Sequence, residues 1–225
     1  MEREIIGSSG ARGLGGFVAS LARLSVLAVA ATPIMAQDVG FEGPSFSGAG
    51  TSTTPTESKP QNKLWFNDGF WWGSLWSNSG NAFRIHRLNF TTHSWVDTGV
   101  AIESRANSHS DVLWDGTKLY IASHQFSSTG SVSGNPIRVY RYSYDDPADT
   151  YRLDSGFPVT IGDFSTEALV IDKDSTGTVW AAWTQARRVR IAHSLGADGS
   201  WSASIVLPTN TTNLDADDIC SLISF

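Results

Sequence analysis

Apolar and polar positions along the chain form a unit that occurs three times and then begins again. Each unit has an apolar strand, a turn with glycine, an aromatic strand, a strand with arginine, and a more polar strand. The units cover residues 63–100, 111–159 and 167–208, and a fourth begins at Asp218. The turn glycines Gly69, Gly116 and Gly177 are 47 and 61 residues apart. The pattern predicts an all-β fold made of repeated sheets.

The first two strands of each unit are almost entirely apolar. The first strands are predicted at residues 64–66, 112–114 and 169–171, and the second strands at 70–72, 119–121 and 179–181. Because these runs do not alternate with polar residues, both faces of each sheet are expected to be buried. Third strands are expected at 83–88, 137–142 and 189–193, and polar fourth strands near 94–98, 151–154 and 201–205.

Sheets buried on both faces and repeated at this spacing are typical of a β-propeller with four-stranded antiparallel blades. The chain would hold about three blades, at residues 63–103, 104–160 and 163–208, and the first strand of a fourth from residue 215. Closed propellers have about four to eight blades. We therefore expect either a fragment of a longer protein, which we favour, or closure by assembly with a second copy.

The N-terminal region predicts export. Residues 1–36 contain arginines ahead of the apolar run Leu24 to Ala31, then Pro33 and a small residue, Ala36, at the expected cleavage point. A membrane anchor is the competing interpretation, but this run is less than half of the roughly 20 apolar residues that a span needs. Residues 37–62 are rich in Ser, Thr, Gly and Pro and are predicted to be a leader or linker. We expect a secreted or extracellular protein with no membrane span after cleavage.

Net charge, cysteine content and histidine placement limit the kinds of partner and site that the chain is expected to have. Loss of residues 1–36 changes the net charge from −6 to about −7, which argues against nucleic acid, because phosphate binding depends on Lys and Arg. Cys220 is the single cysteine and is expected to be a buried apolar residue. His86, His93 and His193 are scattered, so we predict neither a metal site nor a cofactor.

The candidate site consists of polar residues that precede the first strands. They are Arg105, Asn107, His109 and Asp111 before the second unit, Asp163, Ser165 and Glu167 before the third, and Asp215, Asp217 and Asp218 before the fourth. The first strands of a propeller begin at one mouth of its channel, so these side chains should converge there. They could bind a polar ligand or perform acid-base chemistry on a glycoside. Recurrence of Asp111, Glu167 and Asp218 favours a structural role, tying one blade to the next.

A two-residue turn at Asp115-Gly116 would place Asn107 opposite His124, and His109 opposite Ala122. Both imidazoles, His109 and His124, would then lie at the lip of the channel. His124 is therefore included among the candidate ligand-binding residues.

The hairpin sequences Asp174 to Trp180 and Asp115 to Tyr120 resemble blade hairpins of sialidase-like bacterial extracellular propellers. The resemblance covers about residues 63–225 and implies a six- or seven-bladed propeller in the complete protein. Sialidases use an arginine triad, a tyrosine paired with a glutamate, and an aspartate acid; we carry over the fold alone.

Three functions stay open at this point. The leading hypothesis is a secreted binding or scaffold module that recognises a glycan or a cell-surface ligand through the channel mouth. The second is a sialidase-like, exo-acting glycoside hydrolase with Asp111 or Glu167 as acid or base and Arg105 as a carboxylate clamp. The third is an adhesive structural module of a larger surface protein.

Overall fold

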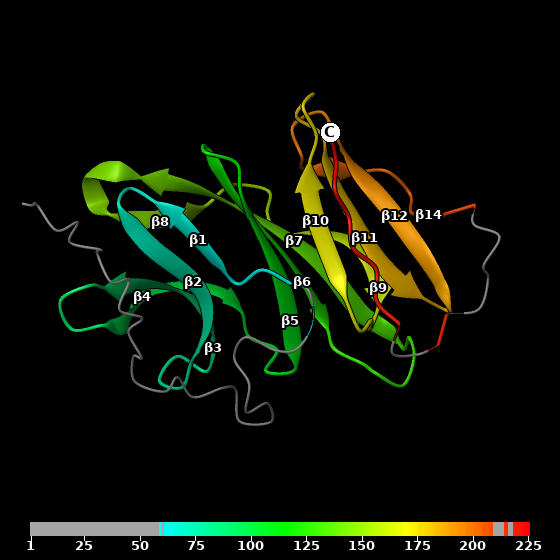
Figure 1. The fold of residues 1–225 in the computed structure, drawn as a ribbon, viewed down its shortest axis with the longest axis horizontal. Helices are drawn as coiled ribbons and strands as arrows, with labels where there is room; N and C mark the ends of the chain where they lie inside the picture. Colours follow the sequence, from blue (N-terminus) through cyan, green and yellow to red (C-terminus); the bar gives the residue numbers. More distant parts are fainter. Residues whose placement is uncertain (1–58, 60, 209–213, 216–217) are drawn as a thin grey trace, which may run out of the picture. The chain divides into compact units, whose positions relative to one another are not determined.

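The computed structural model describes Lys59 and residues 61–208, 214–215 and 218–225, all within one compact unit. The predicted export signal, residues 1–36, lies outside the described residues, as does most of the predicted leader. The described part of the chain consists of antiparallel sheets, and its one helical element is the short 3-10 helix η1 (Asp146–Ala148) (Figure 1).

The first sheet follows the chain order. Its strands are β1 (Leu64–Asn67), β2 (Phe70–Ser77), β3 (Ala82–Asn89) and β4 (Ser94–Glu103). A two-residue loop, Asp68-Gly69, joins β1 to β2, and both of its residues have a positive φ, 50° and 75°. That conformation matches the twist of a hairpin and is one that glycine adopts without strain.

The second and third sheets repeat the order, with a broken fourth strand. The second contains β5 (Ser108–Trp114), β6 (Lys118–Gln125), β7 (Ser133–Asp145), β8 (Thr150–Leu153) and β9 (Val159–Phe164). The third contains β10 (Leu169–Lys173), β11 (Val179–Gln185), β12 (Arg188–Leu195), β13 (Ser200–Trp201) and β14 (Ile205–Val206). Both β8 and β9 pair with β7, and both β13 and β14 pair with β12. The predicted first, second and third strands are thus confirmed, but the single fourth strand predicted near 201–205 is replaced by β13 and β14. The fourth position of these two sheets is shared by two short strands.

Strand β6 shows that the second sheet is buried on both faces. Leu119 and Ile121 pack in a cluster with Trp72 of the first sheet. Tyr120 and Ala122, which alternate with them, pack in a second cluster with Trp183 of the third sheet. Strand β6 is therefore apolar along its length for the predicted reason, because each of its faces packs against a different sheet.

The connection between β5 and β6 differs from the prediction. Trp114 pairs with Leu119, and Asp115 Oδ1 accepts hydrogen bonds from the amides of Thr117 and Lys118, at 2.8 and 2.6 Å. The carboxylate of Asp115 thereby stabilises a turn longer than two residues. The register shifts by two positions as a result, and the predicted facing of Asn107 with His124 was wrong.

The expected first strand of a fourth sheet does not form in the described residues 218–225. No second strand lies there to pair with it, and a strand requires a hydrogen-bonded partner. Cys220 and Leu222 nevertheless pack on Val170 and Ala182 of the third sheet, and Ser224 N donates to Asp172 Oδ2 at 2.8 Å. Cys220 is buried, as the sequence predicted.

Candidate functional site

The residues just before β1 cross the beginnings of β5 and β10. Asn62 donates from its side chain to Val112 O at 3.1 Å, and Lys63 Nζ donates to Ser110 O. Gln61 Nε2 lies 2.9 Å from Leu169 O. We call Lys59 and residues 61–63 the crossing segment, because its contacts reach both the second and the third sheet.

Asp111 joins three elements of the chain. Its Oδ1 accepts the amide of Asn62 at 2.6 Å, and its Oδ2 accepts the amide of Ile171 in β10 at 2.9 Å. The side chain is buried, which raises the pKa of its carboxyl, while these two amide bonds act to lower it. Asp111 lies inside β5 rather than ahead of it, so its oxygens are taken up by the backbone of neighbouring sheets. These contacts give Asp111 a structural role, as the sequence predicted.

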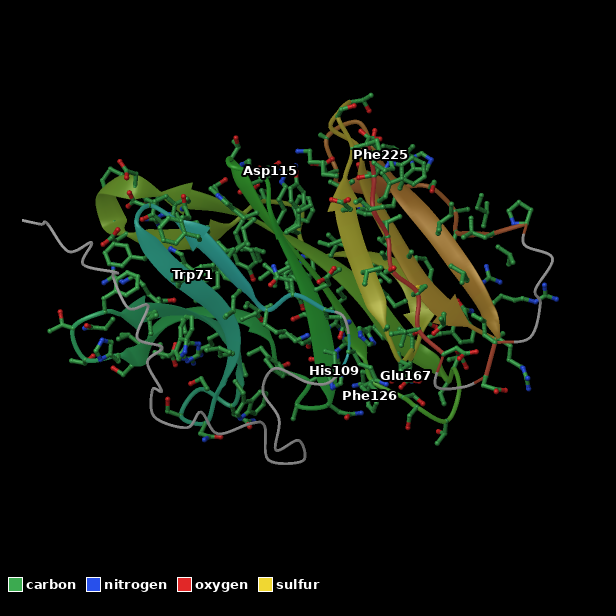
Figure 2. All side chains as sticks on the ribbon, in the orientation of Figure 1. Trp71, His109, Asp115, Phe126, Glu167 and Phe225 are labelled. Carbon is green, nitrogen blue, oxygen red and sulfur yellow. The ribbon has the colours of Figure 1, made fainter. Side chains whose placement is uncertain are left out.

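The two histidines face each other across β5 and β6. His109 pairs with His124, with ring centroids 5.8 Å apart, and the ring of His109 stacks on Phe126 at 4.4 Å. Figure 2 shows His109 at the end of β5 opposite to Asp115. His109 also lies inside the strand, which corrects the predicted placement before it.

His124 is a buried, neutral imidazole. Burial, and to a lesser extent the nearby charge of His109, lower its pKa to about 3. Its Nε2 lies 2.9 Å from Gln61 Nε2, so it accepts a hydrogen bond, and Nδ1 carries the proton 3.2 Å from Gln125 O. At neutral pH this ring is a packing and hydrogen-bonding group rather than an acid.

Arg105 binds a carboxylate that the sequence reasoning missed. Its Nη2 lies 2.7 Å from Glu103 Oε2, and its Nη1 donates to Pro136 O at 2.8 Å. Glu103 closes the apolar run at the end of β4, and a charged residue directly after such a run was a signal that could have identified it. Asn107 is exposed and donates to Phe126 O at 3.3 Å.

Glu103 connects the first sheet to the second. Tyr140 Oη and Ser123 Oγ donate to its Oε2 at 3.2 and 3.3 Å, and Arg138 Nη1 lies 3.4 Å away. Burial would raise the pKa of Glu103, but the bonds from Arg105 and the positive charges outweigh it and hold the pKa below its usual value. Burial and the charge of Glu103 raise the pKa of Tyr140 to about 12.

Glu167 lies just before β10, the first strand of the third sheet. Only 2% of its surface is exposed. Its Oε1 forms an ion pair with Lys59 of the crossing segment, and its Oε2 has no hydrogen-bond partner among the described residues. A buried carboxylate oxygen without a donor costs about 1–3 kcal/mol, so it marks a place where a donor can be gained.

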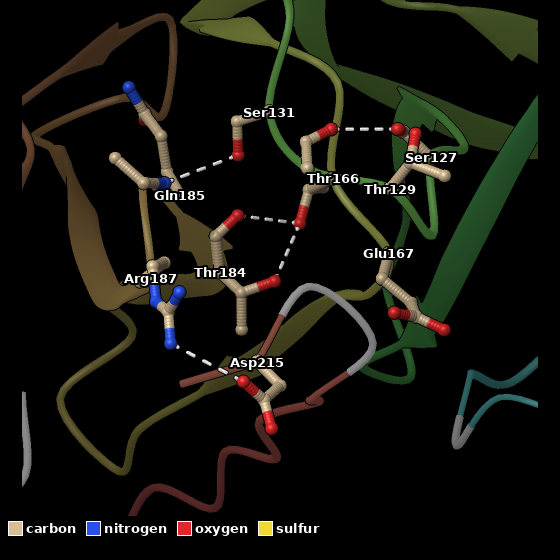
Figure 3. A pocket seen from close by; sticks show the side chains of 11 residues that line it. Ser127, Thr129, Ser131, Thr166, Glu167, Thr184, Gln185, Arg187 and Asp215 are labelled. Carbon is tan, nitrogen blue, oxygen red and sulfur yellow. Dashed lines mark hydrogen bonds and ion pairs between the residues drawn. The ribbon is translucent and has the colours of Figure 1, made fainter. Parts of the chain in front are cut away.

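Glu167 lines a cavity of about 200 Å³, which we call the Glu167 cavity (Figure 3). Its walls come from the β6–β7 loop, the residues before β10, the end of β11 and Asp215. The lining residues are Ser127, Thr129, Gly130, Ser131, Thr166, Glu167, Thr184, Gln185, Ala186, Arg187 and Asp215.

Hydrogen bonds hold the walls of this cavity together. Thr166 Oγ1 donates to Thr184 O at 2.7 Å and lies 3.0 Å from Thr184 Oγ1. Ser127 N donates to Thr166 O at 3.1 Å, and Ala186 N donates to Ser131 Oγ at 3.3 Å. At the exposed side, Arg187 Nη2 lies 3.3 Å from Asp215 Oδ1. The walls are therefore fixed by bonds that leave several hydroxyl groups in the lining.

The structure brings together fewer candidates than the sequence proposed. Among the described candidate residues, Glu167 and Asp215 line the cavity, and Asp218 reaches it indirectly, since its Oδ2 accepts the amide of Asp215 at 2.7 Å. Asp217 lies outside the described residues. Thr184 and Gln185 were missed, although β11 runs antiparallel to β10, so its end was bound to lie beside the beginning of β10.

The described residues include no group of three or more His, Cys, Asp or Glu side chains placed to hold a metal ion. Within the same part of the chain, no helix has the length and apolar character needed to cross a membrane. Comparison with protein-family models and with curated protein sequences gives no match to this chain.

Proposed function

We propose that this chain forms blades of an extracellular β-propeller that acts as a binding module, with its ligand held in the Glu167 cavity. The arrangement of the first strands supports the propeller: β5 contacts both β1 and β10, and Asp111 bonds to the backbone on both sides. Strands that begin side by side in successive sheets would surround a common channel.

The observation that carries the binding proposal is a polar cavity lined by Glu167, a buried residue whose Oε2 has no donor among the described residues. A ligand hydroxyl that displaces the groups covering that oxygen would satisfy it, and Thr184 and Ser131 lie in the same lining. The cavity is smaller than the roughly 300 Å³ at which pockets for drug-sized molecules begin. We therefore propose that it takes a small hydroxylated unit, such as one sugar ring of a glycan.

A sialidase-like hydrolase is the second candidate, and one observation favours it. Tyr140 Oη lies 3.2 Å from Glu103 Oε2, with Arg105 and Arg138 on the same carboxylate. Binding is better supported, because Tyr140 is 5% exposed and its pKa is raised to about 12, which disfavours the ionised phenol that would attack a sugar. Moreover, Glu103, Tyr140 and Arg105 do not line the Glu167 cavity.

A glycan array followed by calorimetry on the hits tests this function. We expect wild-type protein to bind a hydroxylated ligand without releasing a product, and Glu167→Gln to weaken binding at least tenfold. Asp146→Asn, a change to an exposed acid in η1, is the matched control and should bind as wild type does. The proposal fails if the wild type binds no glycan, or if Glu167→Gln, folded by circular dichroism, binds with unchanged affinity.

A further inference from the structure

Each carboxylate that lines the Glu167 cavity in the described structure faces a cation. Glu167 is paired with Lys59, and Asp215 is paired with Arg187. The formal charges of these four side chains cancel. A ligand that enters the cavity therefore meets hydroxyls and hydrogen-bonding oxygens rather than a net charge.

The two pairs differ in how strongly water screens them. Arg187 and Asp215 have side chains that are 59% and 79% exposed, so their mutual attraction is weak. The side chains of Lys59 and Glu167 are 20% and 1% exposed. Charges at such a shielded position interact with a new neighbour more strongly than surface charges do. Lys59 is thus the cation with the greatest influence on what Glu167 can accept.

We infer that Lys59 determines the charge preference of the Glu167 cavity, so that it takes neutral hydroxylated ligands and rejects protonated amines. This inference rests on the proposed ligand binding at Glu167. A hydroxyl can donate to Glu167 Oε2 while Oε1 keeps its bond to Lys59. An ammonium group at the same place would bring a second positive charge beside Lys59, whose own charge already neutralises the carboxylate. Such like-charge contact is a common source of specificity.

Substitutions of Lys59 separate the charge effect from packing. Lys59→Met keeps a long side chain and removes the cation, which leaves Glu167 with an uncompensated negative charge. The double variant Lys59→Met with Glu167→Gln removes both charges and restores neutrality. Lys59→Arg keeps the cation and serves as the conservative control.

The experiment measures affinity by calorimetry for matched pairs of methyl glycosides, each neutral sugar beside its 2-amino-2-deoxy counterpart. A mildly acidic buffer keeps the amine protonated. Wild type and Lys59→Arg should prefer the neutral sugar at least tenfold. Lys59→Met should lose or reverse this preference, and the double variant should not favour the amine.

The outcomes distinguish failure of the role of Lys59 from failure of the binding function. Equal preference in wild type and Lys59→Met, with both proteins binding the neutral sugar, overturns the role of Lys59 and leaves the binding function standing. Reversal in Lys59→Met that persists in the double variant also overturns it, because the negative charge of Glu167 would then not be the cause. If the folded wild type binds no member of the pairs, the proposed binding function is refuted and the inference falls with it. If Lys59→Met does not fold, the comparison uses Lys59→Arg and the double variant. A preference for the neutral sugar that Lys59→Arg keeps and the double variant lacks supports the inference. A preference that both variants keep overturns it.

Discussion

Asp111 in β5 accepts the backbone amide of Ile171 in β10, with 2.9 Å between Oδ2 and N. The bond joins the first strands of the second and third sheets. The other carboxylate oxygen of Asp111 accepts the amide of Asn62, so one buried side chain satisfies backbone groups on both sides of β5. Buried amides without partners are costly, which makes this carboxylate a tie between sheets rather than a free acid.

Replacement of Asp111 by Asn should therefore destabilise the protein. Asparagine retains one acceptor oxygen and directs an NH₂ group toward a second amide donor, so we expect a loss of about 2 kcal/mol in the free energy of unfolding. Urea unfolding followed by tryptophan fluorescence measures it. Asp163→Asn, at an exposed residue of the same type, should change the free energy by less than about 0.5 kcal/mol. Equal stability of the two variants would show that the two amide bonds are not important.

Glu103 predicts a dependence of stability on pH. Its pKa is lowered in the folded protein, so the unfolded chain binds the proton more readily. The stabilisation by Glu103 is complete above the unfolded pKa of about 4.3 and is lost as the pH falls through the lower folded value.

Unfolding of wild type and Glu103→Gln at neutral and at acidic pH tests this sign. The variant should be less stable by about 2 kcal/mol at neutral pH, and the difference should shrink below about pH 4. A difference that stays constant with pH would mean that the charge of Glu103 contributes nothing.

Two adjacent tryptophans in β2 should respond very differently to truncation. Trp72 is 0% exposed and packs between the first two sheets, while Trp71 points to the other face and is 42% exposed. We expect Trp72→Ala to cost about 3–5 kcal/mol through lost burial and a cavity. Trp71→Ala should cost clearly less. Thermal and urea unfolding of both variants compare them directly, and equal losses would contradict the assignment of faces.

The Asp68-Gly69 turn gives a prediction about backbone strain. A Cβ at Gly69 would meet nothing within 4 Å, so Gly69→Ala would be affected only by its φ of +75°. That conformation costs an alanine about 1–2 kcal/mol. Gly199 is the matched control, because it also has open space around the Cβ position but no positive φ of this kind. Gly199→Ala should leave the melting temperature nearly unchanged, and a similar drop in both variants would argue against strain as the cause.

Local signals predicted most of the fold. The strand order within each sheet follows from apolar runs separated by glycine turns, because a hairpin is formed by residues that are close in sequence. The uniformly apolar second strands also predicted burial on both faces, which is confirmed for β6, where Leu119 and Tyr120 pack on opposite sides, and was wrong for β2, where Trp71 is 42% exposed. These features depend on the residues of a single unit and its turns.

Tertiary structure decided the composition of the candidate site, whereas the pairing register of β5 and β6 depends on a local turn that the apolar pattern does not reveal. Asp115 lengthened a turn through its own side-chain bonds, which no pattern of apolar residues encodes. Asp111, Glu103 and Glu167 are all acidic and all near first or fourth strands, yet two are saturated by donors and one keeps a buried oxygen without a partner. That difference arises from distant residues such as Lys59 and Ile171. The sequence by itself determined the sheets, while the chemistry of each carboxylate was determined by which remote donors the packed sheets brought within about 3 Å.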